Sequence, residues 1–125
     1  MDQTLLFTDM GKETTMIFLM NRDLNNFALF ECLKDDEGRK KLTDMYEGYI
    51  KTARDNGVKD LLFLTPTWRT NTAHMTKMGY DASEVEKYNV MAAEFLIGIK
   101  NAHADINIKI VGQLGPAGDG YVPGK

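Results

Sequence analysis

The sequence has one cysteine, no long apolar run and no excess of positive charge. The single cysteine, Cys32, excludes an internal disulfide framework. The longest apolar run, residues 16–20, is far shorter than the ~20 residues that a membrane-spanning helix needs. The N-terminus lacks the basic and apolar segments of a signal peptide. A net charge of -3 disfavours nucleic acid and anionic membranes as partners. These absences predict a cytoplasmic protein with neither kind of partner.

The composition that remains is typical of a folded domain. With 125 residues, of which 43% are hydrophobic and 26% charged, the chain is one globular domain at most. Cys32, His74 and His103 do not have the spacing of metal ligands, and no nucleophile–base signature is present. The residues alone therefore predict no metal site and do not identify a catalytic residue. We expect Cys32 to be buried and His74 to be exposed to solvent.

Hydrophobic patterning predicts three strands that alternate with two helices. The strands are expected at residues 3–8, 60–64 and 107–112, and the second is a continuous apolar run typical of a buried parallel strand. One helix begins near residue 36 and ends at Asn56-Gly57. The other begins after Asp81, which forms a capping box with Glu84. Residues 9–15 are expected to form a loop, and residues 16–34 to be irregular with a short helix near residues 27–33.

Three polar loops follow the three predicted strands, at residues 9–15, 65–71 and 112–124. Because α/β proteins bind ligands beyond the carboxyl ends of parallel strands, these loops hold the candidate binding residues. Each loop also has a structural interpretation: a polar turn at Gly11, a strand end with a buried tryptophan, and a flexible glycine-rich linker. The candidate substrate-binding residues are Asp9, Gly11, Glu13, Thr65, Thr67, Trp68, Arg69, Asn71, Gly115 and Pro116.

The predicted order is β, α, β, α, β, with connections long enough for right-handed crossovers between parallel strands. The fold class is therefore α/β. Three strands alone would leave two open sheet edges and an apolar face without most of its partners. We therefore expect residues 1–125 to be part of something larger.

The order and spacing of these motifs resemble the N-terminal part of the homocysteine S-methyltransferase family. The resemblance runs from about Leu5 to Gly124, and no single motif is diagnostic of it. It is carried by Asp9 to Thr15, Thr65-Pro66-Thr67-Trp68-Arg69, Gly79-Tyr80-Asp81, Asn89, and Gly115-Pro116-Ala117-Gly118-Asp119-Gly120-Tyr121. It implies that residues 1–125 are a partial homocysteine-binding domain, a βαβαβ segment that corresponds to the first three strands of a (β/α)8 TIM barrel.

The same resemblance implies a chemistry and its partners. Members of the family are zinc-dependent methyltransferases that move a methyl group from a donor to the thiol of homocysteine, giving methionine. In the family, cysteines of later strands hold the zinc, and those ligands are absent from this chain. We therefore expect no methyl transfer and no stoichiometric zinc from the 125 residues alone. Met10 replaces a family glycine, and Arg69 replaces an aromatic residue, where a cation would repel a sulfonium or ammonium donor.

Two other functions are compatible with the sequence. The first is a non-catalytic βαβ module that pairs its sheet edges with itself or with another chain. The second is a flavodoxin-like or other βαβ domain that binds a nucleotide at the Gly115 loop, although the glycines there do not match a dinucleotide fingerprint.

Overall fold

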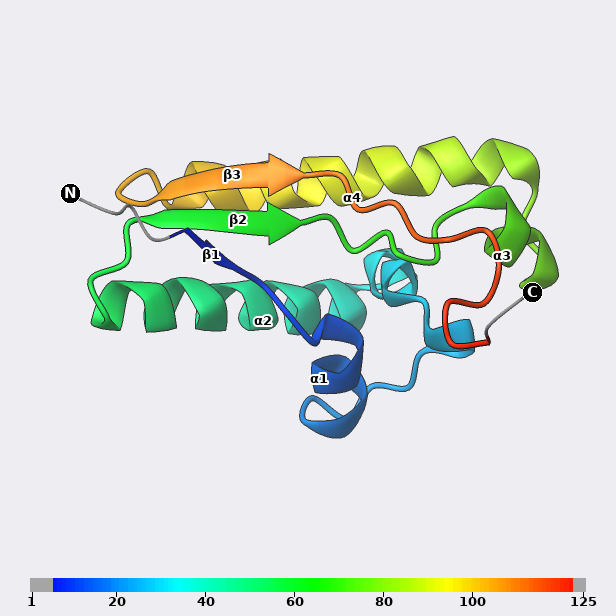
Figure 1. Ribbon diagram of the computed structural model, residues 1–125, viewed down its shortest axis with the longest axis horizontal. Helices are drawn as coiled ribbons and strands as arrows, with labels where there is room; N and C mark the ends of the chain where they lie inside the picture. Colours follow the sequence, from blue (N-terminus) through cyan, green and yellow to red (C-terminus); the bar gives the residue numbers. More distant parts are fainter. Residues whose placement is uncertain (1–5, 123–125) are drawn as a thin grey trace.

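The computed structural model describes residues 6–122 as a three-stranded parallel sheet with helices against one face (Figure 1). The strands are β1 (Phe7–Thr8), β2 (Asp60–Leu64) and β3 (Asn107–Val111), paired in the order β1-β2-β3. The predicted mixed α/β fold with a parallel sheet is therefore confirmed. The strand order differs from the flavodoxin order, in which the first strand lies between the second and the third.

Two long helices connect the strands, and their caps explain where they begin. In α2 (Asp36–Asp55), the Asp35 side chain accepts a hydrogen bond from the Gly38 amide at 2.7 Å. In α4 (Ala82–Ala102), the Glu84 carboxylate accepts a hydrogen bond from the Asp81 amide at 3.0 Å. Both helices confirm the sequence prediction, and Gly57 ends α2 with a φ of 72°.

The segments between the strands hold more helix than the sequence predicts. The predicted loop at residues 9–15 is wrong from Lys12 onward, because α1 (Lys12–Phe18) begins there. The 3-10 helices η1 (Asn25–Phe27) and η2 (Leu29–Lys34) follow, the second near the expected short helix. A further helix, α3 (Thr72–Lys77), was not predicted. Within residues 6–122, no helix is long and apolar enough to cross a membrane.

The strand predictions hold with small differences at the ends. β2 has the predicted bounds, and β3 ends one residue early, at Val111. The described part of the first strand is Phe7–Thr8, and residues 3–5 of that prediction lie outside the described residues.

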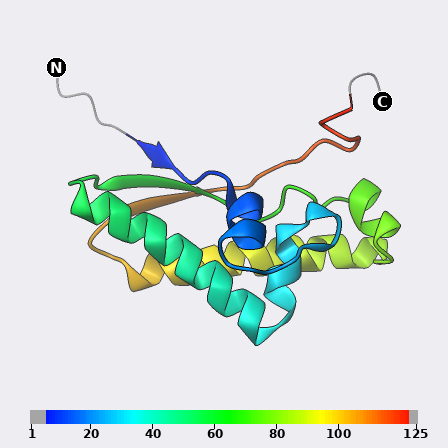
Figure 2. The same cartoon turned by 90° about the horizontal axis from the view of Figure 1, so that it is seen from below.

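The two faces of the sheet have different surroundings. Leu61, Phe63 and Ile108 are buried on the face toward α2 and α4, where they form the core with Tyr46 and Leu96. Figure 2 shows the helices gathered on this one side of the sheet. The opposite face, which we call the bare face, carries no helix of the described residues. Register and alternation place these side chains on it: Thr8, Leu62, Leu64, Lys109 and Val111.

Candidate functional site

The loops after β2 and β3 meet at the carboxyl edge of the sheet through a closed ring of hydrogen bonds. The Gln113 amide donates to Thr65 Oγ1 at 2.9 Å, and Thr67 Oγ1 donates to the Gln113 carbonyl at 2.8 Å. The two threonine hydroxyls are 2.7 Å apart, and both residues are buried. Because the hydroxyls satisfy protein groups, Thr65 and Thr67 join the loops rather than present free donors to a ligand.

The glycine-rich segment packs closely against the loop after β2. A Cβ atom at Gly115 would lie 1.7 Å from the Trp68 carbonyl oxygen, so only glycine fits there. The Trp68 and Tyr121 rings meet edge to face at 5.9 Å. Asn71 Nδ2 donates to the Pro116 carbonyl at 3.3 Å. These contacts dock the segment and disagree with its interpretation as a flexible linker.

Asn71 and His74 connect α3 to the same segment. Asn71 Oδ1 accepts from the His74 amide at 3.0 Å and so caps α3. His74 is 4% exposed, so its predicted solvent exposure is wrong. Its Nε2 lies 3.2 Å from the carbonyl oxygen of Pro116, and its Nδ1 lies 3.0 Å from Arg69 Nη1. Nε2 also lies 3.3 Å from the Gly118 carbonyl oxygen and 3.2 Å from Arg69 Nη1, so the buried ring connects Arg69 to the glycine-rich segment.

Arg69 is held in place by two rings. Its guanidinium carbon lies 4.5 Å from the centroid of the Trp68 ring, and Nη1 contacts His74. Its Nε is buried and has no partner among the described residues. The sequence indicated Arg69 and Trp68 as candidates, but it did not indicate their contact with His74. Asn71, as a residue type that favours the N-cap position, could have indicated the start of α3, but it does not indicate which residues His74 contacts.

The loop after β1 is attached to β2 through a buried carboxylate, which also pairs with a lysine of the same segment. Lys12 Nζ lies 3.0 Å from Asp9 Oδ2, and the Leu64 amide donates to the same oxygen at 3.2 Å. Burial raises the pKa of Asp9, and Lys12 partly offsets this effect. The Asp9 side chain is 0% exposed, so it anchors the loop in this arrangement instead of contacting a ligand.

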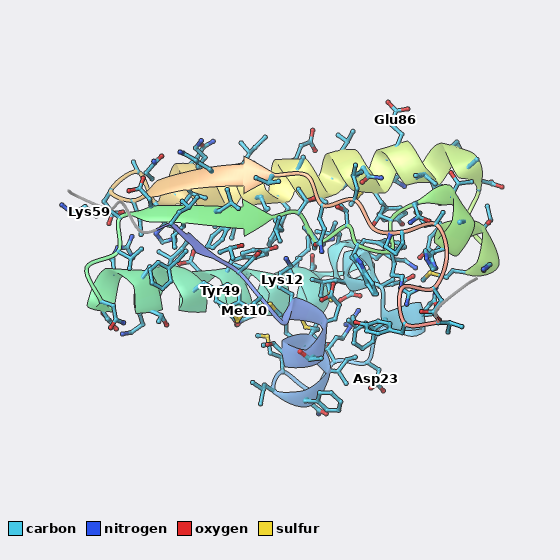
Figure 3. The ribbon with its side chains drawn as sticks, in the orientation of Figure 1. Met10, Lys12, Asp23, Tyr49, Lys59 and Glu86 are labelled. Carbon is cyan, nitrogen blue, oxygen red and sulfur yellow. The ribbon has the colours of Figure 1, made fainter. Side chains whose placement is uncertain are left out.

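Met10, Lys12 and Tyr49 lie near one another where β1 ends (Figure 3). The Tyr49 hydroxyl donates to the Met10 carbonyl at 2.8 Å. The Met10 side chain is 74% exposed, so it points away from the buried ion pair. Lys12 was not among the candidate residues, and it is the first residue of α1, three residues after Asp9.

The remaining residues of the first loop do not join the other two loops. Gly11 has a φ of 56° and precedes α1, as expected of a polar turn with a glycine. Glu13 lies in the first turn of α1. Among the described residues, no hydrogen bond or ion pair connects Glu13 to the loops after β2 and β3.

The described residues do not fit a zinc site. Within residues 6–122, no group of three His, Cys, Asp or Glu side chains could hold a metal ion. Cys32 is buried as predicted, and burial raises its pKa to about 11, which disfavours the thiolate that zinc requires.

The fold and the site define a mixed α/β protein with a parallel sheet. At its carboxyl edge, hydrogen bonds join the loop after β2 to the loop after β3, and we call these two the interlocked loops. Comparisons with protein-family models, curated proteins and solved structures found no match.

Proposed function

We propose that this chain forms the first three strands of a (β/α)8 barrel of the homocysteine S-methyltransferase kind. The enzyme would transfer a methyl group from a small-molecule donor to the thiol of homocysteine, giving methionine. The carboxyl edge of the sheet would border the substrates, as the equivalent edge does in TIM-barrel enzymes.

The bare face is the observation that carries this proposal. Neighbouring strands follow one another in sequence, both long helices cover one face, and Leu62, Leu64 and Val111 project from the other. A barrel wall has this arrangement, because its helices lie outside and apolar side chains fill the interior. Val111 is 37% exposed, so apolar surface on this face is in contact with solvent until further strands cover it.

The contacts divide the candidate residues into two roles. Asp9, Thr65, Thr67 and Gly115 would position the loops, because their polar atoms or backbone are already engaged within the protein. The residues proposed to contact substrate are the more exposed ones, Trp68, Arg69, Asn71 and Pro116, although Asn71 also caps α3 and donates to the Pro116 carbonyl. Trp68 would offer an apolar wall beside the reacting groups. The zinc that the family resemblance implies would need ligands from outside residues 6–122.

The test is methyl transfer by the native protein. The protein would be purified from its source cells with an antibody to this segment, loaded with zinc and given L-homocysteine with a sulfonium, an ammonium or a folate donor. Methionine formation with one donor is the expected result. Trp68→Ala should reduce it at least about tenfold, which corresponds to 1.4 kcal/mol of transition-state stabilisation, while Ile97→Ala on the exposed side of α4 should not. Absence of methionine with all three donors would contradict the proposal.

The bare face also favours a second candidate function, a module that assembles with another copy of itself. Apolar side chains on an uncovered sheet face and unpaired strand edges both favour association with a second sheet. This function requires no catalytic residue. A stable homodimer of the native protein, combined with an absence of methyl transfer, would favour it.

A further inference from the structure

A pocket of about 590 Å³ lies beside the interlocked loops, between α3 and the 3-10 helix η1. Its lining is polar and includes two cationic side chains. The polar residues of the lining are Asn25, Asn26, Arg69, His74, Lys77 and Asp119, and Met78 completes it. We call this space the Arg69 pocket.

The charges of the Arg69 pocket are not balanced by the described residues. Within residues 6–122, no carboxylate forms an ion pair with Arg69 or with Lys77. Asp119 is the acidic residue of the lining, and its Oδ1 accepts a hydrogen bond from the Tyr121 amide at 3.0 Å. Two positive side chains against one carboxylate leave the pocket with a net positive charge, which favours an anion.

The guanidinium of Arg69 is also fixed before any ligand arrives. It packs on the Trp68 ring at 4.5 Å, and its Nη1 contacts His74 Nδ1 at 3.0 Å. A planar guanidinium recognises the paired oxygens of a carboxylate or a phosphate, and a side chain that is already ordered loses less entropy on binding. The amides of Asn25 and Asn26 add neutral donors to the same lining.

We propose that the Arg69 pocket binds the oxyanion group of a small molecule, either a carboxylate or a phosphate, through Arg69 and Lys77. The inference goes beyond the proposed methyl transfer and does not depend on it. An anion site in this pocket would stand even if the native protein transferred no methyl group.

Trp68 is the single tryptophan of the chain, so its fluorescence reports on the guanidinium that packs against it. The 125-residue chain would be titrated with inorganic phosphate and, separately, with acetate, at constant ionic strength. If the fluorescence saturates with phosphate alone, the pocket binds a phosphate group. If it saturates with acetate alone, the pocket binds a carboxylate. Saturation with both anions means that the pocket recognises the oxyanion chemistry that they share. A linear response to both anions would overturn the proposal.

Charge variants separate a specific site from general attraction. Lys77→Gln changes an exposed side chain and should leave the fold intact, while weakening binding about tenfold through the loss of a charge-assisted contact. Arg69→Gln should abolish saturation, and Arg69→Lys should restore only part of it. Lys100→Gln removes the same charge from the exposed end of α4 and should leave the affinity unchanged. Equal weakening by Lys77→Gln and Lys100→Gln would overturn the proposal.

Discussion

Lys12 Nζ lies 3.0 Å from Asp9 Oδ2, and both side chains are enclosed where β1 ends. The same carboxylate accepts a hydrogen bond from the Leu64 amide, so Asp9 joins the first loop to the second strand while Lys12 balances its charge. An ion pair in such a position stabilises the fold only while both partners are present, because either charge alone would be buried without compensation.

Lys12→Met tests this ion pair. The variant should lose about 3–5 kcal/mol of unfolding free energy at pH 7, since it leaves the Asp9 carboxylate buried and unpaired. Burial already raises the pKa of Asp9, so the loss should shrink as the pH falls and Asp9 becomes neutral. Urea denaturation at pH 7 and pH 4 measures both effects. Lys40→Met removes an exposed ion pair with Asp44 and is the control, so its free energy of unfolding should change little. An equal loss of unfolding free energy in both variants would contradict the role of the buried pair.

Asp35 should give the fold a stability that is lost in acid. The hydrogen bonds from Arg22 and from the Gly38 amide lower the pKa of Asp35 to about 2, from the ordinary value of 3.8. Because the folded-state pKa is lowered, this contribution is complete above the ordinary value and disappears as the pH falls through about 2. Asp35→Asn keeps a capping side chain but removes the charge.

Thermal unfolding of Asp35→Asn across this pH range measures the effect. The variant should melt below the wild type at pH 6, and the two midpoints should converge toward pH 2. Asp44→Asn on the exposed side of α2 is the matched control. Its melting midpoint should differ little from that of the wild type at pH 6 and at pH 2. A constant gap between Asp35→Asn and wild type from pH 6 to pH 2 would disagree with the role of the charge.

Gly115→Ala should separate the glycine-rich segment from the loop after β2. The added Cβ would lie 1.7 Å from the Trp68 carbonyl oxygen, which is backbone and cannot rotate away. We expect a loss of about 1–3 kcal/mol, as for other insertions into packed regions, together with faster hydrogen exchange at Thr65 and Gln113. Gly112→Ala has open space at its Cβ and should leave exchange at both positions unchanged. Unchanged exchange in Gly115→Ala would contradict the docked arrangement.

Tyr46→Phe tests how firmly the end of β2 is held. The buried Tyr46 hydroxyl donates to the Leu64 carbonyl at 2.8 Å, so its removal should cost about 1 kcal/mol in chemical denaturation. Tyr49→Phe removes an exposed hydrogen bond to Met10 and should cost less, because water can replace it. A larger loss in Tyr49→Phe than in Tyr46→Phe would show that the first loop, rather than β2, depends on these hydroxyls.

Val111→Lys tests the exposed part of the bare face. If the 125-residue chain self-associates through Leu62, Leu64 and Val111, a charge at Val111 should shift sedimentation velocity profiles toward the monomer. Ile97→Lys places the same charge on the exposed side of α4 and should leave association unchanged. An equal shift in both variants would mean that net charge, and not this face, controls association.

The sequence predicts the elements whose signals are local and strong. The continuous apolar run of β2 and the periodic stripe of α2 are found where they were expected. Short elements gave weaker patterns: α3 spans only Thr72–Lys77, and α1 begins inside an expected loop. Their stability comes from tertiary contacts more than from local propensity, so a pattern read along the chain misses them.

In the candidate site, too, local features are predicted from the sequence and long-range contacts are not. The position of the three loops follows from strand order, so Asp9, Thr65 and Gly115 are correctly placed at the ends of strands. Their roles follow from contacts across more than forty residues, such as Thr67 with Gln113 and His74 with Pro116. Nothing in a single sequence specifies such pairs, and this explains why a buried His74 was expected to be exposed.

The central claim is that further strands of a barrel cover the bare face of this sheet. The intact mass of the native protein, captured from its source cells with an antibody to residues 36–55, tests the claim most directly. The account predicts a chain of about 250 residues or more, because a closed (β/α)8 barrel needs that length. A native product of 14.1 kDa, the mass of these 125 residues, would contradict the barrel and favour the assembly module.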